Sequence, residues 1–317
     1  NGRWEFDLPE NHDMDPQRLQ LLHEALADSS VYAMVTAKDG VIVDEFYQTG
    51  YDETSVFPLH SCSKSFTGAL VGIAIQEGLL GGVDDLLSEY LPQVRELGDQ
   101  GKGQITLRHL LTHTSGLEWY EWGGGASNWI EFQSSPNWVE YILERNLVAQ
   151  PGKQFNYSTG NTHLLAAVLQ QATGMNMLDY AKQVLFDPLG IESVQCIVDG
   201  GNGISMTARD AARFGQLYLE GGLWNGEQII PQWWLEESTT AQNNGAGDGT
   251  GSYGYQWWIR SFGEGRYDTY YAFGAWGQYI FVVPELDLVT VIASHYPENS
   301  YAPRPYFTDY ILAACRG

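Results

Sequence analysis

The chain has 317 residues, of which 39 are Asp or Glu and 16 are Lys or Arg, so its formal net charge is −23. Hydrophobic residues make up 44% and aromatic residues 13%, which argues against intrinsic disorder. Nucleic acid is a poor partner for so much negative charge, because phosphate binding needs a positive surface. The longest apolar stretch, around residues 69–75, falls far short of the roughly 20 residues of a membrane span. We therefore expect an acidic, folded protein with no membrane span and no nucleic-acid partner.

The first part of the chain predicts a helix and then a β-hairpin. Asp15 and Pro16 suit the N-cap and first position of a helix that continues through the apolar pattern to residue 27. Residues 31–47 contain two β-rich runs on either side of Asp39-Gly40. Two such runs around an Asp-Gly pair are a strong hairpin signal.

Helical patterns fill the centre of the chain, and strand patterns follow near its C-terminus. The expected helices are residues 61–78, 107–111, 138–147, 164–172, 178–184, 208–219, 232–237 and 306–314. The expected C-terminal strands are residues 255–260, 270–272, 279–283 and 288–294.

Because strands lie at both ends and helices between them, we predict an α/β fold of the α+β type. An antiparallel sheet is built from both termini and flanked by helices, and a helical domain is inserted into it. We expect residues 1–57 and 250–317 to form the sheet domain and residues 58–249 the helical domain that carries the nucleophile. The active site would lie in the cleft between them.

The tetrad from Ser61 to Lys64 is the clearest candidate for a nucleophile. If Ser61 begins a helix, Lys64 lies one turn further on the same face. The amides and dipole at the helix start favour negative charge near Ser61. A partly desolvated Lys64 could then lose its proton and activate the hydroxyl. The alternative is that Ser61 only caps the helix and Lys64 is solvated.

Two further segments could complete such a site. Tyr157, in a turn-rich stretch ahead of an apolar helix, could face Ser61 and carry protons. It could instead pack at the helix start with its hydroxyl bonded to backbone. Residues 272–278 contain small residues among the C-terminal strands, which would let a backbone N–H approach a ligand as an oxyanion donor. Glycines in strands also mark bulges.

Cysteine and histidine usage indicates no metal site. Cys62, Cys196 and Cys315 include no C-x-x-C pair, and the histidines show no H-E-x-x-H spacing. We expect no metal and no cofactor, and a Cys196–Cys315 disulfide is left open beside three buried thiols. The scarcity of lysine beside excess carboxylate favours a periplasmic, extracellular or salt-rich setting, with a cytoplasmic one left open.

Taken together, these residues resemble the serine β-lactamase superfamily, on the side of class C β-lactamases and D,D-peptidases. In that family a tyrosine motif follows the nucleophile tetrad and a strand motif follows nearer the C-terminus, and the order here matches. The likeness extends from residue 17 to residue 312, with supporting segments at residues 105–117, 151–161, 187–191, 203–210 and 214–218. Within the superfamily the chain is most similar to 6-aminohexanoate-dimer hydrolases, through residues 157–165, 221–230 and 277–285.

The resemblance implies both fold and mechanism. It implies a β-lactamase or penicillin-binding-protein fold and cleavage of a small-molecule amide or ester through an acyl-enzyme. By this resemblance Ser61 is the acylated nucleophile, and Lys64 and Tyr157 share general-base and general-acid duty. The backbone N–H groups of Ser61 and Ala275 would form the oxyanion hole. Histidines 60, 109 and 113 are expected to be structural, because this mechanism uses none.

Two departures from the family pattern bear on the substrate. Thr159 stands at the third place of the Y-x-N motif, and Ala272-Phe273-Gly274 stands where β-lactamases have K-T-G or H-T-G. Because that lysine binds the carboxylate of a β-lactam, we do not expect efficient antibiotic hydrolysis. An amide or ester of a small, uncharged or cationic acyl donor fits better.

An aromatic loop and the C-terminal strand motif supply the expected substrate contacts. These residues are Trp119, Tyr120, Trp122, Asn161, Phe273, Gly274 and Trp276. Glu118 and Glu121 could attract an amine end, although the loop aromatics could instead pack between the domains. The alternatives to an amide hydrolase are a carboxylesterase, a weak β-lactamase or D,D-peptidase, and a non-catalytic penicillin-binding sensor. The oligomeric state is left open.

Overall fold

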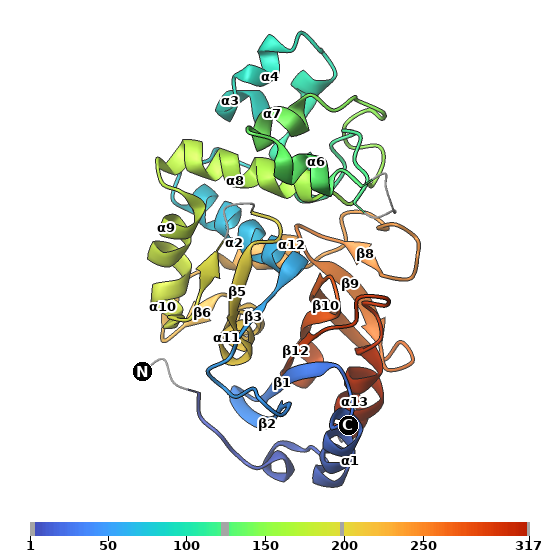
Figure 1. The fold of residues 1–317 in the computed structure, drawn as a ribbon. Helices are drawn as coiled ribbons and strands as arrows, with labels where there is room; N and C mark the ends of the chain where they lie inside the picture. Colours follow the sequence, from blue (N-terminus) through green and yellow to red (C-terminus); the bar gives the residue numbers. More distant parts are fainter. Residues whose placement is uncertain (1–3, 122–126, 197–199, 316–317) are drawn as a thin grey trace.

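A sheet built from both ends of the chain is the centre of the fold (Figure 1). The computed structural model describes residues 4–121, 127–196 and 200–315. In this part of the chain the main sheet has seven antiparallel strands. In spatial order they are β2 (Val41–Tyr47), β1 (Val31–Lys38), β12 (Leu288–Ser294), β11 (Gln278–Val283), β10 (Tyr267–Gly274), β9 (Trp258–Phe262) and β8 (Ser252–Tyr253). The N-terminal hairpin pairs with the last strand, so the predicted fold class is confirmed.

Helices lie on both sides of this sheet and form a separate group above it in Figure 1. In chain order they are α1 (Pro16–Leu26), α2 (Ser63–Gln76), α3 (Leu87–Tyr90), α4 (Gln93–Glu96), α5 (Leu107–Leu111), α6 (Trp129–Ser134), α7 (Trp138–Leu143), α8 (Thr159–Thr173), α9 (Met177–Ala181), α10 (Asp187–Leu189), α11 (Ala208–Leu219), α12 (Gln232–Ser238) and α13 (Leu312–Ala314). No helix of the described ranges is both long and apolar enough to span a membrane.

The two faces of the sheet bury different side chains. Because neighbouring residues of a strand point to opposite faces, Met34 packs in the core that contains α1 and α13, whereas Ala33 packs in the other core. Helix α11 covers that second face, against β1, β11 and β12. Burial of a large apolar side chain contributes about 1.5–3 kcal/mol, so the alternating pattern sets the register of the strands.

The β1–β2 turn needs left-handed backbone at two successive positions. Asp39 has φ 51° and Gly40 has φ 80°. These angles match the primed turns whose twist suits a two-residue hairpin, and glycine adopts them without steric cost. The Asp-Gly pair in the sequence therefore predicted this turn correctly.

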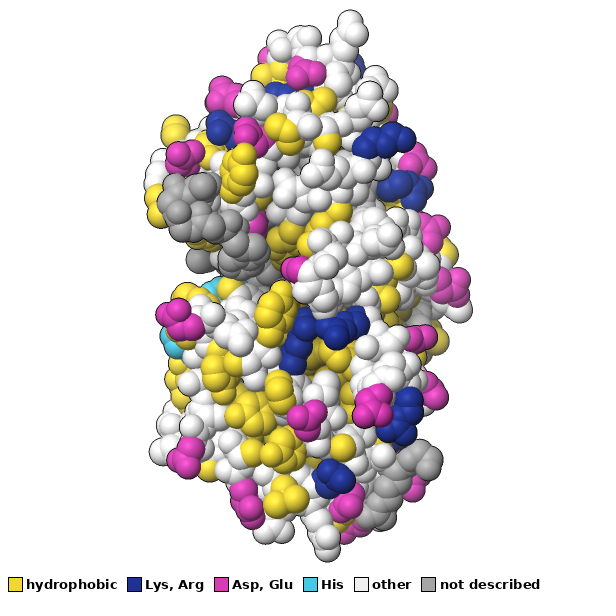
Figure 2. Space-filling model, turned by 90° about the vertical axis from the view of Figure 1, so that its right-hand side faces the viewer, with side chains coloured by type: hydrophobic (Ala, Val, Ile, Leu, Met, Phe, Trp, Pro, Cys, Tyr) yellow, Lys and Arg dark blue, Asp and Glu magenta, His cyan; other side chains and the backbone are white. Residues whose placement is uncertain are grey.

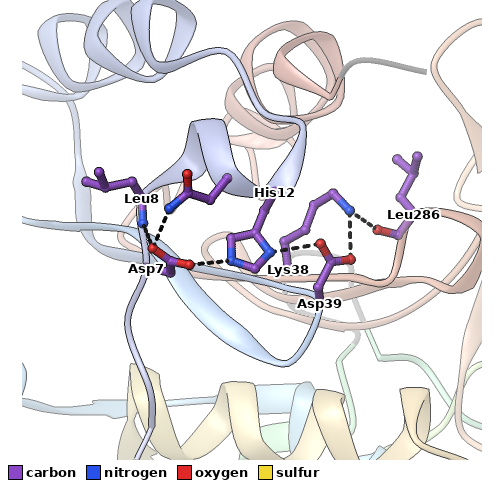
Figure 3. Close-up of polar contacts among 7 residues, drawn as sticks. Asp7, Leu8, His12, Lys38, Asp39 and Leu286 are labelled. Carbon is purple, nitrogen blue, oxygen red and sulfur yellow. Dashed lines mark hydrogen bonds and ion pairs between the residues drawn. The ribbon is translucent and has the colours of Figure 1, made fainter.

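A polar cluster fastens the N-terminal segment to that turn (Figure 3). The His12 ring lies between two carboxylates, with Nε2 3.2 Å from Asp7 Oδ2 and Nδ1 2.9 Å from Asp39 Oδ2. Lys38 Nζ donates to Asp39 Oδ1 and to the Leu286 carbonyl, both at 2.9 Å. The cluster thus connects the chain before α1 to the end of the sheet.

Smaller strands, which the sequence did not predict, lie outside the main sheet. They are β3 (Val56–Pro58), β4 (Gln195–Cys196) and β5 (Ile204–Thr207) in one sheet, and β6 (Leu223–Trp224) and β7 (Glu227–Gln228) in a hairpin. Strands of two to four residues are too short to show a period of two. The first sheet matters for the site, because β3 leads directly into the turn that carries Ser61.

Candidate active site

Ser61 and Lys64 lie at the start of the central helix. Ser61 is in a 3₁₀ turn, His60–Cys62, that continues into α2, and Lys64 is in the first turn of α2. Lys64 Nζ donates a hydrogen bond of 3.0 Å to Ser61 Oγ. Only 1% of Lys64 and 8% of Ser61 are exposed. The alternative of a solvated Lys64 is therefore wrong.

Two further acceptors hold Lys64 Nζ. Nζ lies 2.9 Å from Thr159 Oγ1 and 2.9 Å from the Gly201 carbonyl oxygen. It also lies 4.9 Å from the centre of the Tyr157 ring. Thr159 begins α8, and its predecessor Ser158 caps that helix by accepting from the Asn161 N–H. This cap starts the helix at residue 159, five residues before the predicted start, and brings Thr159 to Lys64.

Tyr157 forms the wall beside Ser61. Its ring stacks on Trp258 at 5.6 Å and packs against His113 at 4.8 Å. Burial raises the pKa of Tyr157 well above its usual value, the charge of Glu121 adds to this, and a hydrogen bond with Ser61 opposes it. The phenol is therefore neutral at physiological pH and has a proton to donate.

The end of β10 passes close to the Ser61 turn. A Cβ at Gly274 would lie less than 3.0 Å from the Leu59 carbonyl oxygen and 3.1 Å from the Ser61 nitrogen. Only a residue without a side chain permits this approach. His60 has φ 47° and Trp276 has φ 66°, and their rings meet edge to face at 4.7 Å. Such left-handed backbone costs about 1–3 kcal/mol per residue and is typical of functional sites.

A cavity of about 330 Å³ opens beside Ser61. Its described walls consist of Ser61, Tyr157, Ala246, Asp248, Thr250, Trp258, Phe273, Gly274, Ala275, Glu298, Asn299, Ser300 and Tyr301. No Lys or Arg is among these lining residues. Figure 2 shows one face of the molecule, with hydrophobic side chains gathered over its lower part and Lys or Arg side chains near its middle.

The predicted aromatic loop does not line this cavity where it is described. Trp119 is only 4% exposed, and its indole N–H donates to Glu121 Oε2. Tyr120 is half exposed, and its hydroxyl donates to Glu118 Oε1 at 3.0 Å. Trp122 lies outside the described residues. Trp119 packs against Phe132 and Tyr141 inside the helical part, and not between the domains.

The other expected substrate contacts divide into two groups. Phe273 and Gly274 line the cavity beside Ser61. Asn161 is buried in the first turn of α8, where its side-chain oxygen accepts from Ser115 at 2.8 Å, and it is not among the lining residues. Trp276 is 39% exposed beside His60 and is also outside the lining set.

Several residues of the site carried no signal in the sequence. Gly201 contributes only a backbone carbonyl, and Tyr301 lines the cavity from the segment after β12. Trp258 was expected only as part of a strand. Thr159 did carry a signal, because it interrupts the Y-x-N motif, but the sequence alone did not reveal its contact with Lys64.

Metal-ligating side chains do not converge in the described part of the chain. No group of three or more His, Cys, Asp or Glu is placed there to hold an ion. Cys62 and Cys315 are free thiols, and the side chain of Cys196 lies outside the described residues. Burial raises the pKa of both thiols, that of Cys315 to about 11.

A serine that accepts a hydrogen bond from a buried lysine, beside a neutral tyrosine, defines the class of serine hydrolases with a β-lactamase fold. The model of the Beta-lactamase family matches residues 20–312, and the chain belongs to that family. This confirms the predicted superfamily, and the protein is a serine hydrolase.

Relatives with several activities are similar to the chain. A 6-aminohexanoate-dimer hydrolase from Paenarthrobacter ureafaciens is 25% identical over 304 residues, which cover 89% of this chain and 76% of that protein. Esterase EstB from Burkholderia gladioli is 28% identical over 150 residues, or 44% of this chain and 38% of that protein. A solved structure from Bacillus anthracis, named as a 6-aminohexanoate-dimer hydrolase, has a TM-score of 0.80 at 24% identity and covers 98% of this chain and 86% of its own.

Proposed function

We propose that the protein hydrolyses the amide or ester bond of a linear, uncharged or cationic substrate through an acyl-enzyme on Ser61. The 3.0 Å contact between buried Lys64 Nζ and Ser61 Oγ carries this proposal. As Ser61 Oγ attacks the carbonyl carbon, neutral Lys64 takes its proton. Lys64 and Tyr157 then deliver a proton to the departing nitrogen or oxygen. Water next attacks the acyl carbon and gives a proton to Lys64, which is neutral again, and transfer of that proton to Ser61 Oγ releases the acid and restores Ser61.

The backbone N–H groups of Ser61 and Ala275 are the proposed oxyanion donors. The close approach of Gly274 to the Ser61 turn supports this assignment, because it brings the two segments together. Both residues also line the cavity. Loss of one such donor typically costs about 10²- to 10³-fold in turnover.

The charges and rings of the cavity support the substrate class. Asp248 and Glu298 line it together with Phe273 and Tyr301. Although burial opposes ionisation, hydrogen bonds from Thr250 hold the pKa of Asp248 below its usual value, so it is charged at neutral pH.

The guanidinium of Arg304 lies close to this wall and is held by tyrosine hydroxyls, because it donates to Tyr279 at 3.2 Å and to Tyr271 at 2.9 Å. The guanidinium of Arg304 lies 4.5 Å from the Tyr301 ring and 5.7 Å from the Phe273 ring. An apolar substrate with a neutral or cationic end therefore suits the cavity better than the carboxylate of a β-lactam. The relative named 6-aminohexanoate-dimer hydrolase supports a linear amide.

A substrate panel tests this proposal. The dimer of 6-aminohexanoate, other linear amides, short p-nitrophenyl esters and a chromogenic cephalosporin are each incubated with the wild type, Ser61→Ala and Glu131→Gln. Glu131 is a matched control, because its exposed carboxylate only accepts from the Tyr141 hydroxyl in the helical part. We expect the wild type and the control to cleave linear amides and esters, Ser61→Ala to cleave neither, and the cephalosporin to react poorly.

Other outcomes would contradict the proposal in different ways. Turnover by Ser61→Ala would remove Ser61 from the reaction. Cleavage of esters without any amide would identify a carboxylesterase. A long-lived adduct with the antibiotic and no turnover of any substrate would identify a penicillin-binding sensor.

A further inference from the structure

Glu121 is connected to Lys64 although it does not line the cavity. Its Oε2 accepts from the Thr159 N–H at 2.8 Å and from the Trp119 indole N–H, and its Oε1 accepts from the Thr159 hydroxyl. Thr159 is 1% exposed and begins the 15-residue helix α8, whose N-terminus favours a negative charge. The carboxylate is therefore held by three donors, one step away from the catalytic lysine.

These contacts fix the direction of the hydrogen bonds that the structure describes at Lys64 Nζ. A threonine hydroxyl has one proton, and here it goes to Glu121. Thr159 Oγ1 can therefore only accept from Lys64, at 2.9 Å. The Gly201 carbonyl, also at 2.9 Å, can likewise only accept. Of these three partners of Nζ, only the Ser61 hydroxyl can either accept or donate.

This arrangement orients the lysine when it loses its proton. A neutral amine keeps two N–H groups and gains one lone pair. The two N–H groups satisfy the obligate acceptors Thr159 and Gly201, and the lone pair then faces Ser61 Oγ. The Ser61 hydroxyl turns to donate, which is the hydrogen bond a general base needs before proton transfer.

We propose that Glu121 is a positioning residue of the catalytic centre, which makes Thr159 an obligate acceptor and so aims the Lys64 lone pair at Ser61. This inference rests on the proposed serine mechanism. It also gives a reason for the departure from Y-x-N. A carboxamide oxygen at the third position accepts regardless of its surroundings, whereas a threonine hydroxyl needs a neighbour such as Glu121 to take its proton.

The variant Glu121→Gln should reverse the two hydrogen bonds of the Thr159 hydroxyl, to position 121 and to Lys64, and leave the bonds at the Oε2 position as they are. Two N–H donors, from Thr159 and Trp119, point at the Oε2 position and require an oxygen there. The amide nitrogen then falls at the Oε1 position and donates to Thr159 Oγ1. The Thr159 proton turns toward Lys64 and competes with Ser61 for the lone pair.

The test is the rate of acylation, measured as the pre-steady-state burst of p-nitrophenol from a short-chain ester. We expect Glu121→Gln to slow the burst by about 10- to 100-fold, within the usual worth of a general base, with KM nearly unchanged. Adding Thr159→Asn to Glu121→Gln should restore most of the loss, since its carboxamide oxygen accepts from Lys64 whatever stands at position 121. Glu131→Gln should match the wild type.

Specific outcomes would overturn the inference. A Glu121→Gln burst within twofold of the wild type, or a double variant as slow as Glu121→Gln, would remove Glu121 from this role. If Glu121→Gln fails to fold, Thr159→Val and Thr159→Asn decide: only the former should lose the burst, and equal rates would contradict the inference. Ser61→Ala distinguishes failure of the serine mechanism from failure of this inference. A burst in Ser61→Ala would refute the serine mechanism. No burst in Ser61→Ala, together with a normal burst in Glu121→Gln, would refute only the role of Glu121.

Discussion

Replacing Gly274 with alanine should slow catalysis, because the added methyl group should push β10 and the Ser61 turn apart by a fraction of an ångström to about one ångström. The φ of Gly274 lies outside the left-handed region, so space and not backbone strain opposes a side chain. Its Cβ would lie within 3.0 Å of the Leu59 oxygen, at least 0.4 Å short of ordinary contact at 3.4 Å. Catalytic groups must keep their geometry to about 0.5 Å. We therefore expect β10 and the Ser61 turn to move apart and the oxyanion donors to lose their alignment.

The expected loss is about 10- to 100-fold in kcat, or about 1.4–2.7 kcal/mol of transition-state stabilisation. Overpacking should also lower the free energy of unfolding by about 1–3 kcal/mol. Steady-state kinetics with a p-nitrophenyl ester, together with urea unfolding, measure both effects. Gly82→Ala is the control, because a Cβ there meets nothing within 4 Å. If Gly274→Ala keeps kcat within threefold of the wild type, the oxyanion hole does not depend on this approach.

Three further predictions concern individual side chains. Lys64→Ala should slow acylation by about 10²- to 10⁴-fold, and a burst of normal rate would contradict its role as the base. Tyr157→Phe should lower kcat and leave KM nearly unchanged, whereas equal losses in both would indicate a packing role. His12 accounts for part of the pH dependence of stability, because its hydrogen bond to Asp39 raises its pKa above 6.5. That stabilisation is complete below pH 6.5 and is lost as the pH rises through the folded-state pKa. The partners of His12 are more than 40% exposed, so urea unfolding should show His12→Asn to be destabilising by less than about 1 kcal/mol near pH 5.5 and by almost nothing near pH 8.5. An equal effect at both pH values would show that the ion pairs do not contribute.

Elements with a clear period and a clear end were predictable from the sequence. The β1–β2 hairpin consists of two β-rich runs around an Asp-Gly turn, and α11 and β12 were found with their observed bounds. Helix α8 was placed too late, because Ser158 was not recognised as its cap. The short strands β3, β4 and β5 are defined by pairing with distant segments, which no local pattern contains.

The site residues likewise divide into those that a local pattern predicts and those that depend on contacts between distant segments. Ser61 and Lys64 are one helical turn apart, so their contact follows from local geometry. Tyr157 was a candidate from its turn-rich segment, but its role was assigned through the family resemblance, because nothing local connects it to Ser61. Glu121 was interpreted as a group that could attract an amine, whereas its carboxylate lies against the start of α8. The position of Glu121 depends on a tertiary contact with Thr159. The residues around position 121 and those around position 159 contain no local pattern that predicts this contact.

The central claim is that Ser61 carries the acyl group during turnover. Acid quenching within the burst, followed by intact mass measurement and peptide mapping, tests it most directly. We predict one added acyl group per chain, located on Ser61, and no addition in Ser61→Ala. Turnover by the wild type with no adduct, or with an adduct on a different residue, would contradict the account.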